Sequence, residues 1–143
     1  MKKKVPFKYT DSGSPNWEIN DCAVAALSIA TGVKYGKAHQ YLTASGRKPT
    51  KGTPRRITNL AYKTSTLGRY RIKMIYGAGR RRKRTLGWFL KENRLPKRCI
   101  VRIFGHVFAV IDGVIRDHEP QGLGCQVRNV WEVSKYWKKE KSS

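Results

Sequence analysis

Three residues of types that together perform nucleophilic catalysis stand far apart in this sequence: Cys22, His106 and Asp117. Cys22 opens the apolar run "CAVAALSIATG", whose spacing is typical of a helix. A thiolate at a helix N-terminus is favoured by the helix dipole and by a nearby imidazolium ion. A histidine oriented by a carboxylate could supply that ion. The alternative is that Cys22 is a small buried residue at the start of a core helix.

The histidine and the aspartate flank a predicted hairpin turn. Asp112-Gly113 separates two alternating apolar runs, which is a strong hairpin signal. A two-residue turn there places His106 opposite Glu119. Because side chains alternate across a sheet, His106 and Asp117 then share one face as diagonal neighbours. We therefore predict a hydrogen bond between His106 and Asp117, with Glu119 as the alternative partner.

Purely structural interpretations exist for the same residues. His106 could be a hydrogen-bonded, half-buried histidine, and Asp117 could cap the end of the hairpin. Cys99 and Cys125 are interpreted as core or loop cysteines. Three cysteines without metal-like spacing predict neither a disulfide framework nor a zinc site. We therefore expect no metal and no cofactor, and a reducing, intracellular setting.

The elements that must position these residues follow from the spacing of apolar residues and from turn signals. Asn20 or Asp21 is expected to cap the first helix, and Thr53 the third. The predicted helices cover residues 21–31, 35–44, 53–66 and 85–92. The predicted strands cover residues 70–76 and 99–104, the two arms of the hairpin, and residues 127–133. Helices followed by antiparallel strands indicate an α+β class.

The whole chain, residues 1–143, is expected to form a single domain, since its length suits one core. Residues 1–15 are interpreted as an extended N-terminal arm, and residues 138–143 as a flexible basic tail. No apolar run reaches the length of about 18 residues that a membrane span needs. The lysines at the start of the sequence are not followed by the apolar stretch of a signal peptide. We expect no contact with a membrane.

The segments "NDCAVAALSIATG", "GHVFAVIDG" and "VIRDHEP" together resemble papain-like cysteine peptidases. The likeness lies in a cysteine on the first helix, a histidine at the start of a later strand and a carboxylate on the next strand. It is greatest to small forms, namely the peptidase domains of bacteriocin-processing transporters and small proteins encoded by bacteriophages. Residues 35–97 have no counterpart in this likeness.

The resemblance implies a papain-like fold, in which N-terminal helices pack on a C-terminal antiparallel sheet. It implies that Cys22 is the nucleophile, His106 the general base and Asp117 the orienting carboxylate. The family often has an amide side chain, more commonly glutamine, a few residues before the cysteine, where it lines the oxyanion hole. The resemblance carries this role to Asn16. The family also often has glycine after the nucleophile, whereas this sequence has Ala23.

The charge of the chain points to polyanionic partners. Lys and Arg number 31 against 9 Asp and Glu, which gives a net charge of +22. No acidic residue occurs from Ala23 through Lys91. Such a field attracts nucleic acids and acidic protein or nucleoprotein surfaces. A glycine-containing segment precedes an unbroken run of five basic residues, namely Arg80, Arg81, Arg82, Lys83 and Arg84. This run has three alternative interpretations: a solvated loop, a contact with nucleic acid, or a contact with an acidic protein.

Two functions follow from these features. The first is a papain-like cysteine peptidase or related thiol hydrolase that acts on a peptide or other acyl substrate. The second is a non-catalytic protein on the same scaffold that binds nucleic acid, or that binds within a virus particle or to a host complex. The resemblance to bacteriophage proteins places either one in the host cytoplasm or in association with a virion.

Overall fold

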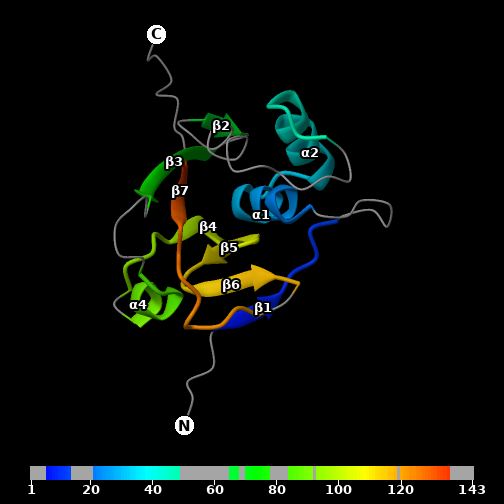
Figure 1. The fold of residues 1–143 in the computed structure, drawn as a ribbon. Helices are drawn as coiled ribbons and strands as arrows, with labels where there is room; N and C mark the ends of the chain where they lie inside the picture. Colours follow the sequence, from blue (N-terminus) through cyan, green and yellow to red (C-terminus); the bar gives the residue numbers. More distant parts are fainter. Residues whose placement is uncertain are drawn as a thin grey trace.

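The computed structural model describes residues 6–13, 21–48, 65–67, 70–77, 84–91, 93–118 and 120–135. These residues form an α+β structure in which helices pack on one mixed sheet (Figure 1). The α+β class predicted from the sequence is therefore confirmed. No helix in these ranges is long and apolar enough to cross a membrane.

The first two helices lie where the apolar spacing predicted them. Helix α1 spans Cys22–Thr31 and helix α2 spans Tyr35–Ala44. α1 ends because Gly32 adopts a left-handed conformation at φ +74°, and its N–H donates to the carbonyl of Ser28 at 2.8 Å. A further short helix, α4, covers Leu86–Lys91, close to the prediction of 85–92.

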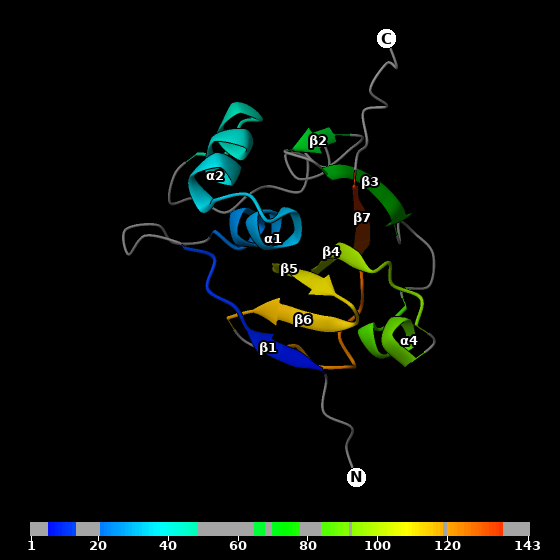
Figure 2. The ribbon, with the colours of Figure 1, turned by 180° about the vertical axis from the view of Figure 1, so that it is seen from behind.

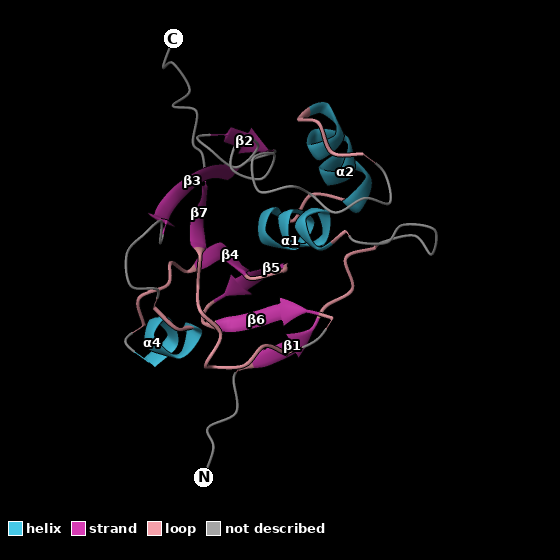
Figure 3. Ribbon diagram, viewed as in Figure 1, coloured by secondary structure: helices cyan, strands magenta, loops and turns pink. Residues whose placement is uncertain are grey.

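Seven strands of the described residues form the sheet, in the order β1-β6-β5-β4-β7-β3-β2. Their bounds are Phe7–Tyr9 for β1, Ser65–Leu67 for β2, Tyr70–Gly77 for β3, Arg98–Ile103 for β4, His106–Ile111 for β5, Val114–Asp117 for β6 and Asn129–Lys135 for β7. Figure 3 shows these strands as one continuous layer, with α1 and α2 together on one side of it.

Two details of the predicted sheet were wrong. The sheet is mixed rather than wholly antiparallel, because β1 pairs in parallel with β6. The third helix was expected to reach about residue 66, but β2 occupies Ser65–Leu67 and pairs with β3. The rest of that helix, including its cap Thr53, lies outside the described residues. Pairing with β3 outweighed the local helical spacing at this point.

The hairpin that carries the candidate residues has the predicted register. Ala109 pairs with Arg116 and Ile111 pairs with Val114 across the β5–β6 turn. Both turn residues have positive φ, +53° at Asp112 and +75° at Gly113. Positive φ at both central residues defines the tight turn that matches the twist of a hairpin. The turn thus accounts for the presence of an aspartate at position 112.

Strand β1 secures the free edge of this hairpin. Tyr9 lies in register with Asp117, and the N–H of Thr10 donates to the carbonyl of Asp117 at 3.0 Å. Figure 2, the view from behind, shows β1 and β6 running side by side at the end of the sheet. Part of the N-terminal arm, expected to be merely extended, therefore fixes the backbone of the strand that bears Asp117.

Apolar side chains form two clusters around the sheet. One joins α1 and α2 to the strands and contains Leu27, Ala38, Val107, Ala109 and Trp131 among its members. The other lies around α4 and contains Leu86, Phe89, Cys99, Phe108 and Ile115 among its members. Neighbouring residues of β5, 107 and 108, belong to different clusters, as the two-residue period of a strand requires. α1 is consequently packed on the sheet along most of its length.

Candidate active site

Cys22, His106 and Asp117 meet at one place in the fold. Cys22 is the first residue of α1, His106 the first of β5 and Asp117 the last of β6. All three line a cavity of about 250 Å³, together with Asp21, Ala25, Gly105 and His118. The cysteine is half-buried, so its thiol is both held by the fold and reachable from the cavity. The structure thus brings three of the candidate catalytic residues, Cys22, His106 and Asp117, to one cavity.

Asp117 holds the histidine ring through a short hydrogen bond. Nε2 of His106 lies 2.5 Å from Oδ2 of Asp117, and the other carboxylate oxygen accepts a bond from the backbone N–H of His118 at 2.8 Å. The Asp117 side chain is only 11% exposed, so water competes little for these bonds. The predicted bond between His106 and Asp117 is present. Glu119, the alternative partner, lies outside the described residues.

The histidine is held in its charged form. Burial by itself lowers the pKa of His106, but this is outweighed by hydrogen bonds to Asp117 and Cys22 and by the charges of those two groups. The net effect raises the pKa of His106 from 6.5 to about 10. The ring is therefore an imidazolium at neutral pH. Since Nε2 is bonded to Asp117, Nδ1 is the ring nitrogen left for the sulfur of Cys22.

The residue before the cysteine is fixed in a way that the sequence did not indicate. Asp21 occupies the cap position of α1, but its side chain makes no capping hydrogen bond. Its Oδ2 instead accepts a bond from the hydroxyl of Tyr35, the first residue of α2, at 2.8 Å. The prediction that Asp21 caps α1 is thus confirmed for its position, although its carboxylate bonds to Tyr35 and not to the first backbone N–H groups of the helix. The other predicted cap, Asn20, lies outside the described residues.

The backbone around Cys22 offers a hydrogen-bond donor to a developing oxyanion. The carbonyl of Asp21 accepts the N–H of Ala25 at 2.9 Å, which starts the hydrogen-bond ladder of α1. The N–H of Cys22 belongs to the first turn, where a helix provides no internal acceptor. This N–H is therefore a candidate member of an oxyanion hole. Asn16, which the resemblance assigned to the same role, lies outside the described residues.

His118, which the sequence analysis did not assign to the site, forms part of its rim. It is exposed, and its ring stacks on that of Tyr9 with centroids 5.7 Å apart. On the other side, Gly105 has a φ of +74° in the turn just before His106. Because β6 ends at Asp117, the alternation of side chains along a strand does not determine which way His118 points.

The other two cysteines lie in different surroundings. Cys99 is fully buried on β4, and burial, with a smaller contribution from the charge of Glu132, raises the pKa of its thiol to about 12. It therefore stays protonated and inert at neutral pH. Cys125 is half-buried and, like the other two cysteines, forms no disulfide. Among the described residues, no group of three His, Cys, Asp or Glu side chains could hold a metal ion.

The predicted basic run is described only at its last residue. Arg80, Arg81, Arg82 and Lys83 lie outside the described residues. The guanidinium carbon of Arg84 lies 4.6 Å from the ring centroid of Trp88, and that of Arg94 lies 4.2 Å from it. Two exposed arginines thus gather on one half-buried indole of α4.

Comparison of this chain with family models, with curated proteins and with solved structures gave no match.

Proposed function

We propose that this protein is a thiol hydrolase of the papain-like type, with Cys22 as nucleophile, His106 as acid–base and Asp117 as the orienting group. One observation carries this proposal: His106 is hydrogen-bonded to the buried Asp117, and both residues line one cavity with Cys22, whose sulfur interacts with the histidine ring. A purely structural histidine has no need of a cysteine beside it at an accessible helix N-terminus. A nucleophilic site, in contrast, needs a carboxylate next to the histidine and the histidine next to the thiol.

The first half of the reaction forms a thioester. The thiolate of Cys22 attacks the carbonyl carbon of the substrate, and the carbonyl electron pair moves to oxygen, where the N–H of Cys22 stabilises it. The tetrahedral intermediate collapses, the bond to the leaving nitrogen breaks, and His106 gives its proton to that nitrogen. The products are a free amine, an acyl group on Cys22 and a neutral imidazole.

The second half releases the acyl group. A water molecule attacks the thioester carbon while the neutral His106 takes one of its protons, and the Cys22 sulfur leaves as a thiolate. The carboxylic acid product departs and the thiolate–imidazolium pair is restored. Asp117 keeps the ring oriented in both halves, because its bond to Nε2 leaves Nδ1 toward the sulfur. The bond cleaved is a peptide, isopeptide or side-chain amide bond.

Differential alkylation of the cysteines tests this proposal. With iodoacetamide, Cys22 should react far faster than Cys99 or Cys125, because it lies at the start of α1 beside His106 and is reachable from the cavity. Peptide mapping by mass spectrometry assigns each site. Replacing Asp117 with asparagine should slow labelling at Cys22 while leaving Cys125 unchanged. Equal rates at Cys22 and Cys125 in the unaltered protein would rule out an activated nucleophile.

Turnover is tested with an activated ester such as p-nitrophenyl acetate. The protein should release one equivalent of nitrophenol in a burst as Cys22 is acylated, followed by a slower steady rate. Cys22→Ser should abolish the burst, and Cys125→Ser serves as the matched control that should retain it. A burst that survives Cys22→Ser would place the nucleophile elsewhere.

A second candidate function is the binding of nucleic acid on the same scaffold. It is favoured by the net charge of +22 and by the two arginines that stack on Trp88. If all five residues from Arg80 to Arg84 contact phosphates, the log–log slope of affinity against salt is about −4 to −5. Replacing these five residues with alanine should flatten that slope, and an unchanged slope would remove the segment from the interface.

A further inference from the structure

We propose that two pairs of stacked arginine and aromatic side chains form a site for single-stranded nucleic acid that reaches the edge of the cavity beside Cys22. One pair consists of Arg84 on Trp88. The other consists of Arg128 on Phe104. The proposal rests on the second candidate function and makes it specific, because it names the form of nucleic acid and assigns two residues outside the basic run.

Phe104 is more exposed than its place in the fold requires. It forms the two-residue turn between β4 and β5 with Gly105, and 84% of its surface is accessible to solvent. The turn favours glycine at position 105, where φ is +74°, but it makes no demand for an aromatic residue at position 104. The ring is not removed from water, so it contributes little to folding. It is therefore available to a partner.

Arg128 makes this ring part of a charged surface. Its guanidinium carbon lies 5.3 Å from the ring centroid of Phe104. Within the described ranges, neither Arg128 nor Arg84 forms an ion pair with a carboxylate. A guanidinium that stacks on a ring keeps its N–H edge for a phosphate. Each pair therefore offers a cation for a phosphate beside an aromatic surface for a base.

Backbone hydrogen bonds hold the two pairs next to each other. The N–H of Val127 donates to the carbonyl of Arg84 at 2.8 Å. The N–H of the next residue, Arg128, donates to the carbonyl of Arg102 at 2.8 Å. The segment before β7 is thus bonded both to the residues that lead into α4 and to β4. The backbones that carry the two pairs are thereby fixed relative to each other.

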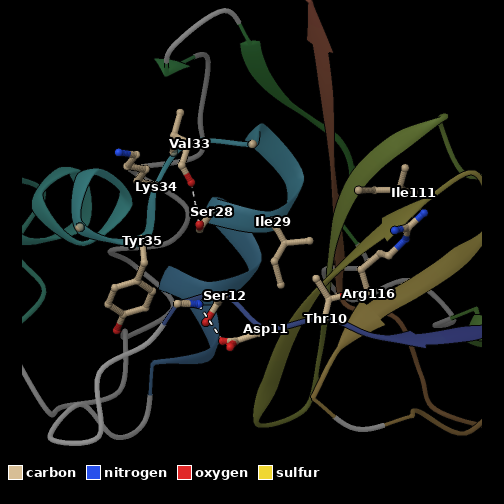
Figure 4. Close-up of a pocket in the computed structure, with 13 residues that line it drawn as sticks. Thr10, Asp11, Ser12, Ser28, Ile29, Val33, Lys34, Tyr35, Ile111 and Arg116 are labelled. Atoms are coloured by element: carbon tan, nitrogen blue, oxygen red, sulfur yellow. Dashed lines mark hydrogen bonds between the residues drawn. The ribbon is translucent and has the colours of Figure 1, made fainter.

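A separate cavity elsewhere in the fold offers no comparable arrangement. It has a volume of about 690 Å³ and lies between the loop after β1, helix α1, the start of α2 and the β5–β6 hairpin (Figure 4). The two cationic residues that line it in the described chain, Arg116 and Lys34, lie on different sides of it (Figure 4). Their charges do not converge on one ligand, so we place the anionic partner at the two arginine–aromatic pairs.

The aromatic surfaces favour a single strand over a duplex. The bases of a duplex are stacked on one another, so their faces are closed to protein side chains. In a single strand, each base offers a face that stacks on an aromatic ring. An acidic polypeptide could pair with the same arginines, but its carboxylates would gain nothing from the rings. The combination of cations and rings therefore favours single-stranded nucleic acid.

The site meets the cysteine cavity at the β4–β5 turn. Phe104 directly precedes Gly105 and His106, which both line that cavity with Cys22. A base stacked on Phe104 therefore lies at the edge of the proposed active site. Binding itself does not depend on catalysis, so failure of the hydrolase proposal leaves this one standing.

Fluorescence anisotropy with labelled oligothymidylate tests the site. The full chain should bind this single strand more tightly than a duplex of the same length at the same salt concentration. Charge alone predicts the reverse, because a duplex carries more phosphates per unit length. Equal affinities, or tighter binding of the duplex, would overturn this proposal and leave the second candidate function standing. Binding of neither nucleic acid at low salt would overturn both.

Substitution of Phe104 separates stacking from charge. Phe104→Ala should fold, because the side chain is exposed, and it should bind oligothymidylate about fivefold or more weakly. Its salt dependence and its affinity for the duplex should not change. Phe104→Trp keeps a stacking ring and should retain the affinity. Ile75→Ala removes another exposed apolar side chain and is the matched control that should bind normally. An unchanged affinity of Phe104→Ala for oligothymidylate would refute the proposal.

Arg128→Gln tests the charged half of the same pair. The log–log slope of affinity against salt should become shallower by about 0.7, the contribution of one phosphate contact on a single strand. Arg71→Gln, the same change at an exposed arginine near the start of β3, is the matched control and should leave the slope unchanged. A slope that Arg128→Gln does not alter would refute the phosphate contact.

Two further measurements identify the partner and the path of the strand. A labelled glutamate peptide, matched to oligothymidylate in charge, should bind more weakly than the nucleic acid. Tighter binding of the peptide would overturn the proposal in favour of an acidic protein. In NMR spectra, oligothymidylate should shift both the amide of Gly105 and the indole N–H of Trp88. Saturable shifts that leave both signals in place would also overturn it.

Discussion

The charge state of His106 provides the sharpest test of the candidate site. A rise of its pKa from 6.5 to about 10 corresponds to about 5 kcal/mol in favour of the charged ring. The hydrogen bond to Asp117 is the largest of the effects that raise this pKa, followed by the bond to Cys22. The two charges contribute in the same order, Asp117 before Cys22. Asp117 should therefore account for more than half of the rise.

The perturbation is Asp117→Asn, which removes the negative charge and keeps the size of the side chain. We expect the pKa of His106 to fall by about 2 pH units or more, because burial, which lowers it, remains in place. Cys22→Ala should lower the same pKa by a smaller amount. The matched comparison thus predicts a ranking as well as a direction.

An NMR titration of histidine carbon and nitrogen resonances measures this pKa directly. His39 serves as an internal reference, since it lies on α2 and does not line the cavity that holds His106 and Asp117. The backbone spectrum of each variant shows whether the fold is retained. Two results would refute the reasoning: titration of His106 near 6.5 in the unaltered protein, or a larger fall in the Cys22→Ala variant than in Asp117→Asn.

Three further predictions concern stability. In the variant Cys22→Ala, the pKa of His106 in the folded state should still lie above its unfolded value of 6.5, so the charged ring stabilises the fold fully below pH 6.5 and this stabilisation is lost as the pH rises toward the folded pKa. Urea unfolding should therefore show a loss of about 2 kcal/mol in the free energy of unfolding by about pH 8.5. The loss should be absent when Asp117→Asn is added. Gly113→Ala, at φ +75°, should cost about 1 kcal/mol in the same assay, and an unchanged midpoint would contradict the turn. Tyr35→Phe should lower the free energy of unfolding by about 1 kcal/mol and slow the alkylation of Cys22. An unchanged stability together with an unchanged alkylation rate would show that the bond to Asp21 contributes to neither.

The hairpin was predictable because its signals are local. Asp112-Gly113 specifies the turn, the turn specifies the register, and the register places His106 beside Asp117. Helix α1 was predictable for a similar reason, since apolar spacing and Gly32 determine its extent. In these segments, local preference and tertiary packing favour the same structure.

Features that depend on distant partners could not be read from the sequence. β1 is three residues long with no apolar alternation, and only its pairing with β6 makes it a strand. The bond between Asp21 and Tyr35 joins two helices, so capping preference alone gave the wrong partner. The cavity beside Arg116 arises where four separate segments meet, which no single stretch of sequence indicates.

The parallel pairing of β1 with β6 also bears on the order in which the site is assembled during synthesis. α1 is translated early, but a helix of 10 residues is only marginally stable until it packs on the sheet. Its cysteine then has no base, since His106 and Asp117 are translated much later. β1 is made before either, yet it has no partner until the hairpin folds. The nascent chain therefore carries an unactivated thiol for most of its translation. If the protein is a hydrolase, its own folding delays activity until nearly all of the described chain is in place.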